Sequence, residues 1–447
     1  MPKGLTPHSI IYDLVTAGDP QISPDGTTLL FTKSWAEPDE ANSRSAVWIA
    51  NADGSNQRLL AGEGKRSSQA RWSPDGARIA FVSDRGDRGN AILVMPAGGG
   101  EATELARHRG GINGLSWSPD GVTLAYTSVF DPDDPEDQGP DKDAAPPIRV
   151  VRRIDYKQDN RGFLNDVRQQ IWLANTDGSG ARTLTSESFD FEFPQWSPDG
   201  STLAAKILLR NGMEGQLGLV DVATGTVSRI GPEHGTVGVF AWSPDGNAIL
   251  FGGDTEQTWQ YDLFLYDLAS KTIERLTGDL QVQPDAGFAT VSPPSQPVWL
   301  DGETVLLPAF RGGASGLYRF DIETRALHPV QTSDAVFSGS SFDRQSGTIY
   351  QAGSSLDGTG QIVRTTLDPP STTVIVDLNA DFLQKTPPAG WETFQIERNG
   401  CQIDAWVLKP PGFDPAKRYP MVLDIHGGPN SWYGPGFTPV PQALAGA

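Results

Sequence analysis

The stretch Trp72-Ser73-Pro74-Asp75-Gly76, followed by the apolar run Ile79–Val82, is one copy of an element that recurs along this chain. In a type I turn Ser suits the first position, Pro fixes φ at the second and Gly closes the turn. An apolar run follows each copy, so each copy predicts a β-hairpin with a period of about 45 residues, which is typical of a repeat fold. The tetrapeptide Ser-Pro-Asp-Gly stands at Ser23–Gly26, Ser73–Gly76, Ser118–Gly121, Ser197–Gly200 and Ser243–Gly246.

Two further copies are degenerate and bring the number of predicted hairpins to seven. Trp299-Leu300-Asp301-Gly302 and Phe342-Asp343 each precede a short apolar run. A second set of apolar runs, which begins with Val47–Ala50 and ends with Gln361–Val363, interleaves with the first and also has seven members. We therefore predict a mainly β chain with a seven-bladed β-propeller of four-stranded blades over residues 21–380. An array of β-sandwiches is the alternative, and the in-register period disfavours it.

The long interval between the third and fourth intact copies contains an insertion at residues 130–168. Its first half is acidic and its second half is basic. One interpretation, which we favour, is a solvated loop whose two halves pair with each other. The other is a gate, or an arginine pocket for a substrate carboxylate, because Arg binds carboxylates through two parallel hydrogen bonds. The candidate substrate-binding residues of that pocket are Arg149, Arg152, Arg153 and Arg161.

Composition excludes several classes of partner. The formal net charge of −20 argues against nucleic acid and against anionic membranes, which both need basic surfaces. Cys401 is the single cysteine, so no intrachain disulfide is possible. The chain has no apolar run of signal-peptide or membrane-spanning length, and a cytoplasmic protein is expected. No His, Cys or Asp cluster has the spacing of metal ligands, and we expect neither a metal nor a cofactor.

A different pattern begins after the repeats, over residues 381–447. Asn399-Gly400 between two alternating segments predicts a hairpin with a type I′ turn. The continuous apolar run Met421–Ile425 predicts a strand buried on both faces, as in a parallel α/β sheet. His426, Gly427 and Gly428 follow it. A His-Gly-Gly loop after such a strand can aim backbone N–H groups at a developing oxyanion, as in α/β-hydrolases.

These residues together resemble the prolyl oligopeptidase family of serine peptidases, in its acylaminoacyl-peptidase branch. The opening Asp19–Gly26, the segment Tyr156–Leu164 and the loop Asp424–Pro429 carry the resemblance. It implies a propeller that restricts access to an α/β-hydrolase domain, and cleavage of short or N-acylated peptides through an acyl-enzyme. By resemblance the N–H of Gly428 is an oxyanion donor, with His426 and Gly427 shaping the loop. Residues 1–20, with a short helix started by Thr6-Pro7, are expected to pack on the hydrolase domain.

The chain departs from that family in one large respect. No G-x-S-x-G motif occurs, and the segment closest to it, Gly353–Asp357, lacks the final Gly. The Ser-Asp-His triad is therefore expected beyond Ala447, and the chain alone is expected to be inactive. The expected partners are short peptide substrates, the remainder of the hydrolase domain and, as an open question, a second copy of the chain. Two alternatives remain: a propeller that binds protein partners without catalysis, and an esterase.

Overall fold

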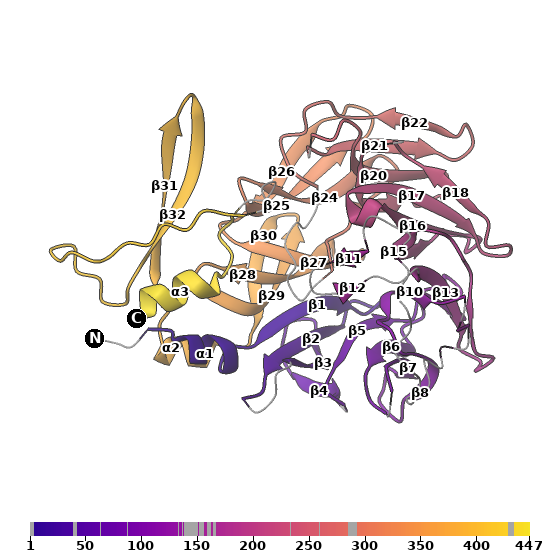
Figure 1. Ribbon diagram of the computed structural model, residues 1–447, viewed down its shortest axis with the longest axis horizontal. Helices are drawn as coiled ribbons and strands as arrows, with labels where there is room; N and C mark the ends of the chain where they lie inside the picture. The colour runs from indigo at the N-terminus through magenta and orange to yellow at the C-terminus, as the bar shows by residue number, and fades with distance from the viewer. Residues whose placement is uncertain are drawn as a thin grey trace. The chain divides into compact units, whose positions relative to one another are not determined.

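The structure is a computed structural model, and it forms two compact units. It describes residues 4–38, 43–62, 64–86, 88–132, 134–135, 137, 151, 156–158, 162–163, 167–232, 234–258, 260–284, 293–427 and 433–447. One unit comprises residues 1–62 and 281–447, and the other comprises residues 63–280. Among the described residues the repeats form seven four-stranded antiparallel sheets, and the fold is a seven-bladed β-propeller (Figure 1).

Three of the seven sheets belong to the first unit. The first is β1 (Thr16–Ile22), β2 (Thr28–Ala36), β3 (Ser43–Asn51) and β4 (Arg58–Ala61). In chain order the sixth sheet is β23 (Val298–Trp299), β24 (Thr304–Arg311), β25 (Ala314–Asp321) and β26 (Leu327–Thr332). The seventh is β27 (Val336–Asp343), β28 (Thr348–Ser355), β29 (Gly358–Leu367) and β30 (Pro370–Asp377).

The second unit holds the other four sheets. The second sheet in chain order is β5 (Ser67–Trp72), β6 (Arg78–Ser83), β7 (Asn90–Pro96) and β8 (Thr103–His108). The third is β9 (Asn113–Trp117), β10 (Thr123–Phe130), β13 (Arg168–Asn175) and β14 (Ala181–Thr183). The next is β15 (Asp190–Trp196), β16 (Thr202–Leu209), β17 (Glu214–Asp221) and β18 (Val227–Ile230). The last is β19 (Thr236–Trp242), β20 (Ala248–Asp254), β21 (Asp262–Asp267) and β22 (Thr272–Arg275). A short pair, β11 (Lys157–Gln158) and β12 (Gly162–Phe163), lies within the insertion, and a 3-10 turn, η1, covers Arg210–Gly212.

The five Ser-Pro-Asp-Gly turns have the predicted geometry and connect the first two strands of the first five sheets in chain order. In the copy at Ser243, the N–H of Gly246 donates to the carbonyl of Ser243 at 3.0 Å. The Ser243 hydroxyl donates to Asp245 Oδ1 at 2.6 Å and accepts the N–H of Ala248 at 2.9 Å. The same three bonds recur in the other four copies, so the turn fixes where each second strand begins.

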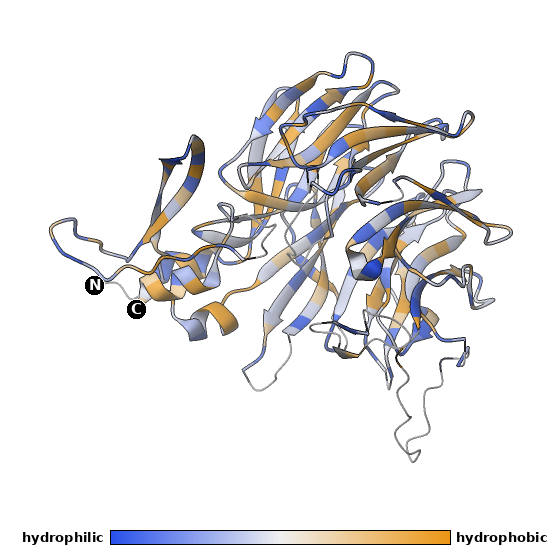
Figure 2. Cartoon of the chain, turned by 45° about the horizontal axis from the view of Figure 1, so that its top comes forward, coloured by the Kyte–Doolittle hydropathy of each residue, from blue (hydrophilic) through white to orange (hydrophobic). Residues whose placement is uncertain are grey.

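The core lies between neighbouring sheets of each unit, where apolar strands face one another (Figure 2). In the first unit Phe31 and Leu29 pack against Tyr350 and Ile362, so the first and last sheets of the repeat meet through apolar side chains. Each such fully buried side chain contributes roughly 1.5–3 kcal/mol relative to an exposed one.

The remaining elements belong to the first unit and come before or after the repeats. Helix α1 covers Pro7–Tyr12 with Thr6 as N-cap, in agreement with the prediction, and α2 covers Ala380–Lys385. Strands β31 (Gly390–Arg398) and β32 (Cys401–Lys409) form the predicted hairpin, with positive φ at Asn399 and Gly400 as a type I′ turn requires. Helix α3 covers Pro439–Gly446.

Candidate functional site

The predicted buried strand before the His-Gly-Gly motif is not formed. Residues 420–427 have no strand partner among the described residues. The side chains of Met421, Leu423 and Ile425 are 85%, 75% and 74% exposed. The strand does not form within the described residues because a strand buried on both faces needs neighbouring strands and a layer on each face. The described strands of this chain supply neither to this segment.

The motif itself lies on that exposed segment. The ring of His426 packs edge-on against Tyr433, with 5.9 Å between ring centroids, and His426 Nδ1 lies 3.3 Å from the carbonyl oxygen of Gly427. Partial loss of hydration and the adjacent Asp424 carboxylate raise the pKa of Tyr433 above its usual value. Gly428, the predicted oxyanion donor, lies outside the described residues.

The chain on the far side of the motif is anchored to the propeller sheets of the first unit. The N–H of Phe437 donates to Ser354 Oγ at 2.9 Å, next to the turn between β28 and β29. Gly434 passes so close to Gly313 that a Cβ at position 434 would lie 2.2 Å from the carbonyl oxygen of Gly313. Ser354 therefore has a structural role, and Ser355, at the serine position of the segment most like a nucleophile motif, donates to Asp357 Oδ1 at 2.8 Å.

The insertion makes a contact that the sequence did not predict. Arg109, which follows β8, donates from Nε to Asp137 Oδ1 at 2.6 Å and from Nη2 to Asp134 Oδ2 at 2.7 Å. These two acidic residues therefore pair with Arg109, which lies next to the second sheet. The predicted binding residues Arg149, Arg152, Arg153 and Arg161 lie outside the described residues.

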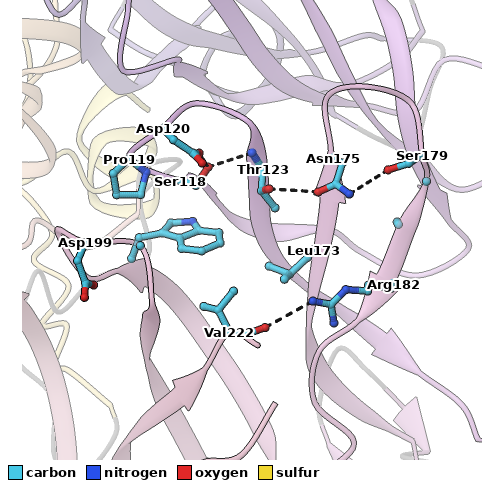
Figure 3. Close-up of a pocket in the computed structure, with 14 residues that line it drawn as sticks. Ser118, Pro119, Asp120, Thr123, Leu173, Asn175, Ser179, Arg182, Asp199 and Val222 are labelled. Carbon is cyan, nitrogen blue, oxygen red and sulfur yellow. Dashed lines mark hydrogen bonds between the residues drawn. The ribbon is translucent and has the colours of Figure 1, made fainter. Parts of the chain in front are cut away.

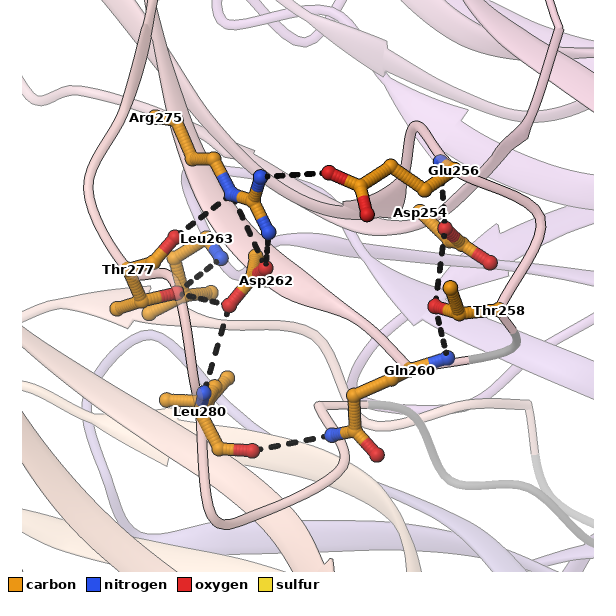
Figure 4. Close-up of polar contacts among 9 residues, drawn as sticks. All are labelled: Asp254, Glu256, Thr258, Gln260, Asp262, Leu263, Arg275, Thr277 and Leu280. Carbon is orange, nitrogen blue, oxygen red and sulfur yellow. Dashed lines mark hydrogen bonds and ion pairs between the residues drawn. The ribbon is translucent and has the colours of Figure 1, made fainter.

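A second polar cluster lies at the end of the fifth sheet, where β20 connects to β21 (Figure 4). Arg275 Nη2 and Nε both bind Asp262 Oδ2, and Nη1 binds Glu256 Oε1 at 3.1 Å. Asp262 is only 5% exposed, and its Oδ1 accepts the Thr277 hydroxyl at 2.8 Å. The hydrogen bond to Asp262 raises the pKa of Arg275 further above its usual value. The charged residues that stand close together between residues 254 and 275 of the sequence could have indicated this cluster.

A similar cluster of charged side chains lies at the end of the fourth sheet, where β16 connects to β17. Glu214, whose side chain is 9% exposed, lies 3.1 Å from Arg210 Nη1 and 3.5 Å from His234 Nδ1. Because strand direction alternates, this end of each sheet is opposite to the end that carries the Ser-Pro-Asp-Gly turns. The insertion leaves its sheet at the same end, between β10 and β13.

Comparison with known proteins agrees with this fold. A family model described as PD40, the TolB beta propeller domain, matches residues 151–391. The uncharacterized peptidase YuxL of Bacillus subtilis is 26% identical, and the match covers 97% of this chain and 68% of the relative. Dipeptidyl-peptidase 5 of Porphyromonas endodontalis is 24% identical, over 96% of this chain and 63% of the relative.

The solved structures add a match of the fold itself. Pyrococcus horikoshii acylaminoacyl peptidase superposes with a TM-score of 0.73 at 17% identity, over 98% of this chain and 64% of that chain. The chain thus spans about two thirds of the length of these proteins. The matches confirm the resemblance to peptidases of the prolyl oligopeptidase family, and the chain belongs to the family of TolB β-propeller domains.

Proposed function

We propose that this chain is the propeller and the first part of the catalytic domain of a serine peptidase that acts on short or N-acylated peptides. The relatives are named as peptidases, and the structural neighbour is an acylaminoacyl peptidase. In this proposal the nucleophile, the triad Asp and the triad His come from the third of the relatives' length that the chain does not span. The 447 residues alone are then inactive.

The observation that carries the proposal is the exposed apolar surface between residues 390 and 425. Along the hairpin β31–β32, one face presents Phe394, Ile396 and Ile403, each between 45% and 47% exposed. The run Met421–Ile425 adds side chains that are more exposed still. Exposed apolar side chains gathered on one face in this way mark an interaction site. Further strands of a hydrolase sheet would cover it and convert residues 421–425 into the buried strand that the sequence indicates.

The proposed chemistry assigns a backbone role to the His-Gly-Gly loop. Once residues 421–425 are paired in a sheet, the N–H of Gly428 is placed to donate to the oxyanion of the tetrahedral intermediate. Removing one such donor typically lowers kcat by about 10²–10³-fold. His426 and Gly427 shape the turn, because Gly allows the close approach of backbone that this geometry needs. In this proposal the propeller also selects substrates by size, and it admits short peptides and excludes folded proteins.

The test is peptidase activity in the protein read from its natural open reading frame. We expect that protein to hydrolyse N-acetyl-alanine p-nitroanilide or a dipeptidyl p-nitroanilide, and to be labelled by a fluorophosphonate probe for active serines. The 447-residue chain should do neither. A natural protein that fails to react with both substrates and with the probe would contradict the proposal and favour a binding module.

Two variants of the natural protein separate chemistry from size selection. Gly428→Pro removes the proposed N–H donor, and kcat should fall by about 10²-fold or more, while full activity would refute the role of Gly428. Deletion of residues 130–168 should change the ratio of rates on long and short peptides more than the rate on a p-nitroanilide. Equal effects on all three substrates would exclude a gating role.

A further inference from the structure

A cavity of about 440 Å³ lies between the third and fourth sheets of the propeller, beside their Ser-Pro-Asp-Gly turns (Figure 3). It is within the range typical of small-ligand sites. One wall comes from Asp120, Thr123 and Arg182 of the third sheet and its turns. The other comes from Trp196 and the turn residues Asp199 and Gly200 of the fourth. Nothing described so far uses this cavity.

The preceding groove, between the second and third sheets, is built in the same way and is occupied by a side chain of the protein. There Arg78 of β6 reaches across to the third sheet and lies over the ring of Trp117, with Cζ 5.2 Å from the ring centroid. Its Nη2 donates to the carbonyl oxygen of Gly121 at 2.7 Å, and its Nη1 donates to Thr176 Oγ1 at 3.1 Å. The protein thus fills this groove with its own guanidinium group, held by an aromatic face and two oxygens.

The repeat makes the two grooves comparable residue by residue. Arg78 and Thr123 occupy the same position, since the N–H of each binds the hydroxyl of the first residue of its turn, at 2.9 Å in both. Trp117 and Trp196 are also equivalent: each indole N–H donates to a carbonyl of the preceding sheet, at 3.1 and 3.2 Å. The next groove therefore has a Trp, but the position equivalent to Arg78 is Thr123 and carries no guanidinium group.

Thr123 does not replace the missing group. Its hydroxyl donates to Asn175 Oδ1 of its own sheet at 3.1 Å (Figure 3). The environments of the two turn glycines differ in the same way. A Cβ at Gly121 would meet Arg78 Nη2 at 3.5 Å and Pro74 at 3.6 Å. A Cβ at Gly200 would meet only the equivalent proline, Pro119, at 3.6 Å. The position beside Gly200 that corresponds to the guanidinium group of Arg78 beside Gly121 is therefore unoccupied by the protein.

The charges around the opening favour a cation. Asp120 and Asp199 both line it, and hydrogen bonds from the hydroxyls of Ser118 and Ser197 are the main cause of their lowered pKa values. Both are therefore ionised at neutral pH. Arg182 is the one cationic residue of the lining, and its Nη2 contacts the carbonyl oxygen of Val222 at 3.5 Å (Figure 3). The two carboxylates of the lining outnumber this one guanidinium group.

We propose that this cavity binds the guanidinium group of an arginine residue carried by a peptide or protein partner. The guanidinium lies over Trp196 and donates to the carbonyl oxygen of Gly200, as Arg78 does with Trp117 and Gly121. Stacking of Arg on an aromatic face and charge-assisted hydrogen bonds are the interactions that distinguish it from a neutral side chain of the same shape. The proposal is independent of peptidase activity.

The probe for the test is N-acetyl-L-argininamide, with the neutral N-acetyl-L-citrullinamide as its isosteric control. Binding is followed by ¹⁹F NMR of the chain labelled with 5-fluorotryptophan, and the Trp196 resonance is assigned with Trp196→Phe. We expect a saturable shift of that resonance with a dissociation constant on the order of 1 mM, and binding at least tenfold weaker for citrulline. No saturable shift, or equal shifts with both probes, would overturn the proposal.

Three variants test whether binding depends on the position that is Arg78 in one groove and Thr123 in the next. Thr123→Arg should fill the cavity from within and abolish the Trp196 shift. Ala248→Arg places the same residue at the equivalent position of the fifth sheet and should leave the shift unchanged. Arg78→Ala covers the case in which Thr123→Arg does not fold, because it should make Trp117 responsive to the argininamide. Retained binding in Thr123→Arg, or an unresponsive Trp117 in Arg78→Ala, would contradict the proposal.

Discussion

The side-chain amide of Gln442 in α3 donates to the carbonyl oxygen of Leu356 at 2.6 Å, between β28 and β29. Its Oε1 accepts the N–H of Ala389 at 2.8 Å. Gln442 is completely buried, and Ala389 and Leu356 are almost so. One side chain therefore joins the last helix, the connection before β31 and the last propeller sheet.

Gln442→Ala should destabilise the docking of α3, because it leaves a buried N–H and a buried carbonyl without partners. Each unsatisfied group costs roughly 1–3 kcal/mol. Amide hydrogen exchange within residues 439–446 should accelerate, and the urea midpoint should fall. Val440→Ala, at a position that is 66% exposed on the same helix, is the matched control and should change stability by less than about 0.5 kcal/mol. Equal effects of the two substitutions would contradict this role of Gln442.

The sequence predicted the blades well because their signals are local. Turn chemistry at Ser-Pro-Asp-Gly fixes the start of each second strand, and the last repeat strand ends at Asp377, where the composition changes. The bulges in the first strands were not predictable in the same way. Gln69 and Phe193 adopt positive φ without being Gly or Asn. At Gln69 the compensation is non-local, since its side chain binds Ile112 and Gly114 of the next sheet.

The candidate site was predicted less well, because burial and pairing depend on distant residues. The apolar run Met421–Ile425 has the composition of a buried strand but no described strand beside it. Similarly, the contact of Arg109 with Asp134 and Asp137 joins residues far apart in the sequence, and the charge pattern within the insertion did not indicate it. The groove occupied by Arg78 became interpretable only when equivalent positions of two sheets could be compared.

The turn at Ser243 leads to a prediction about the free energy of unfolding. Ser243→Ala removes the hydroxyl that binds Asp245 and the N–H of Ala248, and it should cost roughly 1–2 kcal/mol in urea unfolding. Asn247→Ala removes only an exposed bond to the same carboxylate and should cost less.

The same turn predicts a direction for the pH dependence. The Ser243 hydroxyl is the main cause of the lowered pKa of Asp245. A carboxyl whose pKa is lowered in the folded state stabilises the fold above its unfolded value of 3.8, and this stability is lost as pH falls through the folded value. The loss of stability below pH 4 should therefore be smaller in Ser243→Ala than in the wild type, as measured by urea midpoints. An unchanged acid profile would contradict this assignment.

The ion pairs at the base of the insertion should contribute measurable stability. The side chains of Arg109, Asp134 and Asp137 are 32%, 25% and 24% exposed, and Arg109 also donates from its backbone N–H to Asp137. Arg109→Gln should lower the free energy of unfolding by roughly 1–2 kcal/mol. A double-mutant cycle with Asp137→Asn should give a coupling energy above about 0.5 kcal/mol. Lys417→Gln, in an exposed pair, is the control, and purely additive effects of Arg109 and Asp137 would exclude a direct contribution.

Buried His108 should make the protein less stable in mild acid. Its Nε2 lies 2.9 Å from the hydroxyl of Tyr126, and the residue is 4% exposed. Burial lowers the pKa of His108, while the nearby Asp137 opposes the shift. The unfolded chain therefore binds a proton below about pH 6.5 that the folded chain resists, and stability falls as pH drops below that value.

The slope for one such group is at most about 1.4 kcal/mol per pH unit, and the effect is absent above the unfolded pKa. Urea midpoints between pH 7.5 and pH 5 measure it. His108→Gln keeps a hydrogen-bonding group beside Tyr126 but cannot become charged, so its stability should fall less between these pH values. His328→Gln, at an exposed position, is the control for replacing a histidine by glutamine. Parallel profiles for His108→Gln and the wild type would show that His108 titrates alike in the folded and unfolded chain, against the effect that its burial requires.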